Sequence, residues 1–207
     1  MSLPDAPARP RWRLPVIAPI VVVVLGLLVA SCGINNIPTY EETSKARWSE
    51  VENQYQRRSD LIPNLVETVK GFAKQEREVL EQVTQARSRA TAIQATPDLV
   101  NNPETFKKFQ EAQAQLSGAL GRLLAVSERY PELKSNQNFL ALQAQLEGTE
   151  NRIAVARRDY IEAVRIYNTE LRTLPGVIWA KLLYSTSKPM AEFSVAEDVK
   201  RNPQVKF

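Results

Sequence analysis

The side chains that could do chemistry in this sequence are few, because it contains no histidine and a single cysteine. Histidine is the usual general base, the commonest metal ligand and the partner of Ser or Cys in catalytic dyads. Without it, the Glu-x-x-His pairs that hold two irons in helical bundles cannot exist. One cysteine forms neither an intramolecular disulfide nor a thiolate metal cluster. We therefore expect no enzymatic activity, no cofactor and no metal.

The remaining candidates are charged residues that fall among apolar ones. Arg58 and Glu76 occupy stations of an apolar stripe, where polar groups more often fix helix register or oligomeric state than perform chemistry. A competing hypothesis is a small-ligand binder or enzyme that uses Arg58, Glu76 and Glu170. That hypothesis requires the three side chains to line one cavity.

A third set of candidates surrounds a proline. Pro63 could expose backbone carbonyls and re-aim its neighbours Asp60 and Asn64, which would make this segment a docking surface. A structural bend is the simpler interpretation. Together with Arg58 and Glu76, these three residues are the candidates for register or interaction.

The N-terminal region predicts a membrane anchor. Residues 14–30 carry no charge and follow Arg9, Arg11 and Arg13. As a helix this run would span roughly 25 Å, which suits either a signal peptide or a marginal transmembrane helix. The arginines favour a cytoplasmic N-terminus, with the bulk of the chain extracytoplasmic.

The anchor run ends in Val29-Ala30-Ser31-Cys32-Gly33, which resembles a bacterial lipobox. Cys32 stands where that motif needs the cysteine that receives lipid, so we predict a lipoprotein with lipid attachment at Cys32. The alternative is a retained transmembrane helix in which Cys32 is only a small residue near the helix end.

The rest of the chain is near neutral, with 24 basic and 22 acidic residues from Gly33 onward. The two signs alternate instead of forming basic patches with interleaved aromatics, so we expect no nucleic-acid partner. Seven glycines and long stretches of Ala, Gln, Glu, Arg and Leu favour helix. We predict an all-α fold, overwhelmingly helical over residues 40–174.

Apolar residues recur every three or four positions in three stretches, residues 48–93, 106–130 and 139–174. Breaks at residues 95–102 and 131–136 make sequential helices antiparallel, and a period near 3.5 implies a left-handed supercoil. Asn102 and Pro103 should begin the second stretch as cap and first helical residue. The predicted core comprises Leu65, Phe72, Val83, Leu116, Leu120, Leu142, Leu146 and Ile153.

The first stretch leaves one choice open at Pro63. The stripe keeps its phase across the proline, which favours one kinked helix. Alternatively, Ser59 and Asp60 cap a new helix, and residues 40–58 fold back as a separate fourth helix.

Several segments resemble the LemA family of bacterial membrane proteins: QRRSDLIPNLVETVKGF at 56–72, ERYPELKSN at 128–136, TENRI at 149–153 and RRDY at 157–160. The resemblance covers residues from about Asn35 to about Phe193. It implies an antiparallel four-helix bundle behind an N-terminal membrane segment, and it supplies no catalytic residue. It also implies association with a membrane, since members of the family are membrane-associated proteins that are sometimes encoded beside membrane proteases.

These observations divide the chain into an arginine-bearing flank at 1–13, a signal or anchor segment at 14–32, a helical bundle at 35–185 and an irregular tail at 186–207. We expect a membrane-tethered scaffold or adaptor. Its partners would be membrane lipid and a membrane or envelope protein such as a membrane protease.

Overall fold

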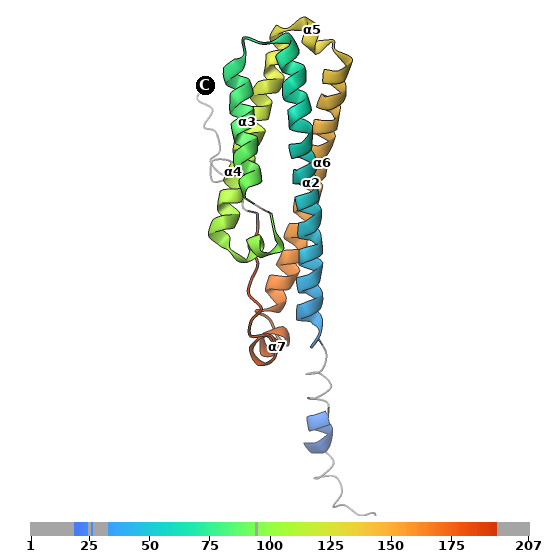
Figure 1. Cartoon of the computed structure of the whole chain (residues 1–207). Helices are drawn as coiled ribbons and strands as arrows, with labels where there is room; N and C mark the ends of the chain where they lie inside the picture. The colour runs from blue at the N-terminus through green and yellow to red at the C-terminus, as the bar shows by residue number, and fades with distance from the viewer. Residues whose placement is uncertain (1–18, 25, 27–32, 94, 194–207) are drawn as a thin grey trace, which may run out of the picture.

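The computed structural model describes residues 19–24, 26, 33–93 and 95–193, and this part of the chain is all-helical. Four long helices run along one another (Figure 1). They are α2 (Asn36–Phe72), α3 (Arg77–Ala92), α4 (Pro103–Val126) and α6 (Gln137–Glu170). Shorter elements are η1 (Pro97–Asn101), η2 (Ser127–Arg129), α5 (Pro131–Lys134) and α7 (Gly176–Leu182).

The helices associate mainly as two pairs, because α2 packs along α6 and α3 packs along α4. Two apolar clusters fill the space between the pairs. One lies toward the α2–α3 turn and is mostly aliphatic, with Leu65, Val83 and Leu116 among its members. The other lies toward the start of α2 and is rich in aromatic rings. Its rings, with centroids 5.0 to 6.5 Å apart, are Trp48, Tyr55, Phe106, Phe109, Tyr160 and Phe193.

Pro63 lies inside α2, which continues through it as one helix. Of the two alternatives left open by the sequence, the single helix is confirmed and the fold-back of residues 40–58 is wrong. The unbroken phase of the stripe was the correct guide, because burying one continuous face outweighs the loss of one backbone hydrogen bond.

The chain instead reverses between Phe72 and Arg77, where the sequence predicted a continuous stripe. The amide N–H of Ala73 still donates to the Val69 carbonyl at 2.8 Å, and α3 starts only at Arg77. This turn creates the fourth long helix and corrects the prediction that Glu76 occupies a station of the apolar stripe. Glu76 lies in the turn.

Six of the eight predicted core residues are buried. Phe72 is the error: its side chain is 39% exposed, because α2 ends there and the ring no longer has a facing helix. Leu142 is only half-buried and packs against the edge of the aliphatic cluster.

Two asparagines start helices, and the first of them, Asn102, does so as the sequence predicts. The side chain of Asn102 accepts a hydrogen bond from the Thr105 amide, and Pro103 is the first residue of α4. Asn136 accepts from the amides of Asn138 and Phe139 and starts α6. Each cap supplies a partner to amide groups that the helix itself leaves without one.

The described part of the tail packs against the bundle. Met190 and Phe193 are buried against the aromatic cluster, and the Ala191 amide donates to the Val100 carbonyl at 2.7 Å. The hydroxyl of Tyr160 donates to the Ala191 carbonyl at 2.7 Å. An extended segment of the predicted irregular tail therefore docks on the bundle.

The described residues contain no helix that is both long and apolar enough to cross a membrane. Residues 19–24 are helical, but most of the predicted anchor lies outside the described residues. Cys32 lies outside them as well, so lipid attachment stays a prediction.

Candidate functional site

Arg58 is a buried cation at the middle of the bundle, and its residue is 1% exposed. Its Nη1 donates to Glu150 Oε1 at 2.7 Å and to Ser117 Oγ at 2.9 Å, and its Nη2 donates to Gln113 Oε1. The guanidinium carbon lies 5.1 Å from the ring centre of Tyr55. One side chain on α2 therefore joins α4 and α6.

The electrostatics of this cluster favour a structural role. An arginine stays protonated under all physiological conditions, so Arg58 cannot accept a proton from a substrate. Glu150 balances its charge, and the 41% exposure of the Glu150 side chain leaves that carboxylate partly solvated. Burial raises the pKa of Tyr55, while the charges of Arg157 and Arg58 act in the opposite direction. The phenol is thus neutral near pH 7.

Pro63 has a specific consequence one turn earlier in α2. Because proline lacks an amide hydrogen, the carbonyl of Ser59 loses its partner within the helix. The Nε of Arg87 on α3 donates to that carbonyl at 2.9 Å. The carbonyl that lacks a helical partner because of the proline therefore attaches α3 to α2, and Arg87 occupies it instead of another protein.

Asp60 and Asn64, the two candidates beside Pro63, face outward. Asp60 accepts a hydrogen bond from the exposed Gln56 side chain at 2.8 Å, one turn earlier on the same helix. Asn64 is exposed, and its carbonyl accepts from the Thr68 hydroxyl at 2.8 Å. Neither residue reaches the Arg58 cluster.

Glu76 joins two turns at one end of the bundle. Its carboxylate accepts from the Tyr130 hydroxyl and from Arg129 Nη2, each at 3.0 Å. These contacts fasten the α2–α3 turn to the segment between η2 and α5. Glu76 is thus a positioning residue for the two connections.

Glu170 lies at the other end of the bundle, where Oε1 accepts from the Asn36 side chain at 3.1 Å. Arg58, Glu76 and Glu170 are therefore dispersed at the middle and both ends. A ligand-binding or catalytic site built from all three residues requires one shared cavity, and these positions do not share one.

The sequence model of the LemA family matches residues 47–207. The chain belongs to the LemA family. It is also similar to magnetosome proteins MamQ 1 and MamQ 2 of Paramagnetospirillum magneticum, each 28% identical over 89% of this chain and 74% of the relative. Magnetosome protein MamQ of Magnetospirillum gryphiswaldense is 25% identical over 77% of this chain and 63% of the relative.

In this LemA-family chain, two grooves flank the buried arginine. A groove of about 480 Å³ between α4 and α6 is lined by Ser117 and Glu150, which both accept from Arg58. A second, of about 330 Å³, is lined by Tyr55 and Gln113. Each groove is therefore lined in part by a side chain that already accepts a hydrogen bond from Arg58: Ser117 and Glu150 in the first, Gln113 in the second.

Sequence reasoning missed the partners of Arg58. A signal existed, because the apolar pattern of the second stretch skips a station at Gln113 and that of the third skips one at Thr149 and Glu150. Polar stations that face one another in a bundle are expected to pair. The sequence does not say which stations lie at the same level.

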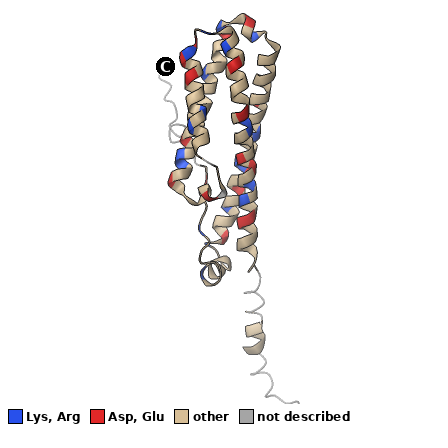
Figure 2. Cartoon of the chain, in the orientation of Figure 1, with Lys and Arg blue, Asp and Glu red and all other residues tan. Residues whose placement is uncertain are grey.

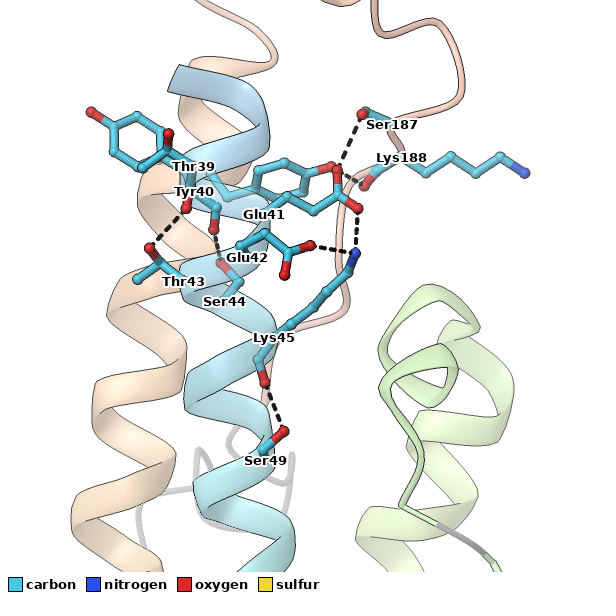
Figure 3. Close-up of polar contacts among 11 residues, drawn as sticks. Thr39, Tyr40, Glu41, Glu42, Thr43, Ser44, Lys45, Ser49, Ser187 and Lys188 are labelled. Carbon is cyan, nitrogen blue, oxygen red and sulfur yellow. Dashed lines mark hydrogen bonds and ion pairs between the residues drawn. The ribbon is translucent and has the colours of Figure 1, made fainter. Parts of the chain in front are cut away.

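A further polar group joins the start of α2 to the loop after α7 (Figure 3). Glu41 receives hydrogen bonds from Lys45, at 2.9 Å, and from the Ser187 hydroxyl, at 3.3 Å. The Tyr167 hydroxyl donates to the Lys188 carbonyl at 3.1 Å. Hydrogen bonds to Glu41 and Glu42 raise the pKa of Lys45, so this lysine keeps its charge through the physiological range.

Proposed function

We propose that this LemA-family chain is a membrane-tethered scaffold that catalyses no reaction. Its four long helices form an antiparallel bundle with a left-handed supercoil, and the bundle surface holds another membrane or envelope protein, such as a membrane protease. One observation carries the proposal: Arg58, Glu76 and Glu170 each join separate helices or turns instead of facing a shared cavity. The relatives are named for the magnetosome and not for a reaction, which agrees with a structural role.

The tether rests on the uncharged run at residues 14–30 and the arginines before it. Lipid attachment at Cys32 would remove the preceding residues, and the bulk of the chain would lie outside the cytoplasm. Cys32→Ala should then abolish acyl labelling and leave a longer, unprocessed chain. An intact mass that shows an unmodified Cys32 in a chain with its arginine-rich N-terminus would favour the transmembrane alternative.

The outer side of α6 is the surface best suited to hold a protein partner. Leu140, Val155 and Ile166 are large apolar side chains exposed along this helix. At about 100° per residue the three positions fall within an arc of about 80°, so they lie on the same half of α6. Charges of both signs are spread along the long helices (Figure 2), and Arg158, Glu162 and Arg165 are exposed on α6 itself.

The test is photo-crosslinking in the native membrane. A photoreactive residue at Val155 of the full chain should form adducts with a membrane or envelope protein. The same residue at Arg89, an exposed position on α3, is the matched control. If Val155 yields no protein adduct above Arg89, the scaffold proposal fails.

A further inference from the structure

Four large apolar side chains project from α7 and the residues beside it. Leu174, Ile178, Leu182 and Leu183 are exposed, with Leu174 and Leu182 at 74% and 69%. Ile178 and Leu182 are four residues apart on α7, a spacing that places them on one side of that helix, while Leu174 precedes the helix and Leu183 follows it. Four exposed large apolar side chains within ten residues are typical of an interaction site in a folded protein.

The same segment contains no acidic residue. Residues 171–190 carry three basic side chains, Arg172, Lys181 and Lys188, and all three are exposed. The ribbon of α7 is almost entirely in the colour of uncharged residues (Figure 2). Apolar side chains flanked by basic ones are the pattern that binds the surface of an anionic bilayer.

This segment is fastened beside the point where the chain enters α2. In Figure 1, α7 lies at the end of the molecule where α2 begins. Gly33 lies against Pro175 and has φ +90, a conformation that favours glycine. A Cβ on Gly176 would lie 2.2 Å from the Glu170 carbonyl oxygen, so only glycine lets the segment leave α6 this closely. The Asn36 side chain then ties the start of α2 to Glu170.

Both anchors that the sequence allows place the bilayer surface next to Gly33. A transmembrane helix would end near Ala30, and a lipid would be attached at Cys32. Three residues of extended chain reach at most about 11 Å, so Gly33 stays within that distance of the headgroups in either case. A Cβ on Gly33 would lie 3.6 Å from the Pro175 ring, so the segment at Pro175 is held at about the same level.

We propose that residues 174–183 are a second membrane contact, in which Leu174, Ile178, Leu182 and Leu183 enter the boundary between headgroups and acyl chains of an anionic bilayer. This inference rests on the tether of the proposed function. The contact limits how far the bundle can tilt relative to the bilayer. The long axis of the bundle is thereby held at a fixed angle to the membrane.

The test uses the full chain in vesicles of equimolar phosphatidylcholine and phosphatidylglycerol. A photoreactive residue is placed at Ile178 or Leu182, with exposed Leu140 near the start of α6 as the matched control. Flotation measures the tether, and the mass of the crosslinked peptide identifies the adduct. We expect lipid adducts at 178 and 182 and none at 140.

The outcomes separate the two proposals. A chain that floats but forms no lipid adduct at 178 or 182, or forms adducts there only with a second copy, overturns the membrane contact alone. A chain that does not float overturns the tether and this inference together.

A second variant tests the chemistry of the contact. In a chain with the photoreactive residue at Leu183, the pair Ile178→Asp and Leu182→Asp should abolish lipid adducts while flotation and helicity persist. Leu140→Asp should leave the adducts unchanged. Adducts that persist in the double variant overturn the proposal.

Discussion

Replacing Pro63 with alanine should stabilise the protein. Pro63 is exposed, so the substitution opens no cavity in the core. It restores the amide hydrogen that can donate to the Ser59 carbonyl within α2, and it removes a residue that disfavours the helix interior. The prediction depends on the partner that this carbonyl already has, the Nε of Arg87 at 2.9 Å.

The magnitude follows from two opposing contributions. Proline inside a helix is about 3 kcal/mol less favourable than alanine. The hydrogen bond from the charged Arg87 already recovers about 1.5 kcal/mol of that difference. We therefore expect Pro63→Ala to raise the free energy of unfolding by about 1.5 kcal/mol, which corresponds to a rise in Tm of about 3–6 °C for a domain of this size.

A second substitution makes the reasoning specific to this carbonyl. Arg87→Met keeps the aliphatic stem but leaves the Ser59 carbonyl without a partner, which should cost about 2 kcal/mol in the natural chain. In the Pro63→Ala background the amide at residue 63 supplies the hydrogen bond, and the same change should cost about 0.5 kcal/mol. The two substitutions are thus coupled by about 1.5 kcal/mol.

The assay is urea unfolding of the full chain in mild detergent, followed by far-ultraviolet circular dichroism for all four variants of the cycle. A decrease in stability on Pro63→Ala would show that the proline itself is needed for packing. Equal costs of Arg87→Met in both backgrounds would show that the Ser59 carbonyl does not matter to stability. Either result refutes the argument.

Three further predictions use the same measurement. Arg58→Ala should lower the free energy of unfolding by about 3–5 kcal/mol, because it removes a buried cation with partners on two helices. Glu150→Gln should lower it less, because that carboxylate is partly solvated. Equal losses would contradict this account. Burial raises the pKa of Tyr160 above its ordinary value of about 10, so the folded state favours the neutral phenol. Stability should be full below about pH 10 and fall as pH rises beyond it, and Tyr160→Phe should fall less steeply; an identical pH profile would refute the assignment. Leu65→Ala should lower the free energy of unfolding by about 2–5 kcal/mol and Phe72→Ala by less than about 1 kcal/mol, since only Leu65 is buried. Similar losses would show that Phe72 is buried too, as a continuous apolar stripe requires.

The helices themselves follow from local sequence. Apolar residues at helical spacing identify the faces that become buried, and Asn102 and Asn136 begin their helices by accepting hydrogen bonds from amides two or three residues ahead. The sequence also indicated that Arg58 needs partners, because a charged residue on an apolar stripe must be paired when it is buried. Each of these signals acts between residues on the same or the adjacent turn, so one stretch of sequence contains it.

The reversal between Phe72 and Arg77 was decided by tertiary structure. The apolar stripe is in phase on both sides, and no proline marks the turn. A continuous helix and a hairpin therefore have similar local preferences. The hairpin prevails because it packs α3 along α4 and fastens the turn through Glu76 and Tyr130.

The partners of Arg58, the docking of the tail through Phe193, and the position of α7 beside Gly33 also join segments far apart in the chain. Such contacts depend on which helices pair and at what level, and that is set by the summed burial of many side chains. The amino-acid sequence by itself determined the helices and the need of Arg58 for partners. Only the packed bundle decided which residues those partners are, because contacts between distant segments have no local signal.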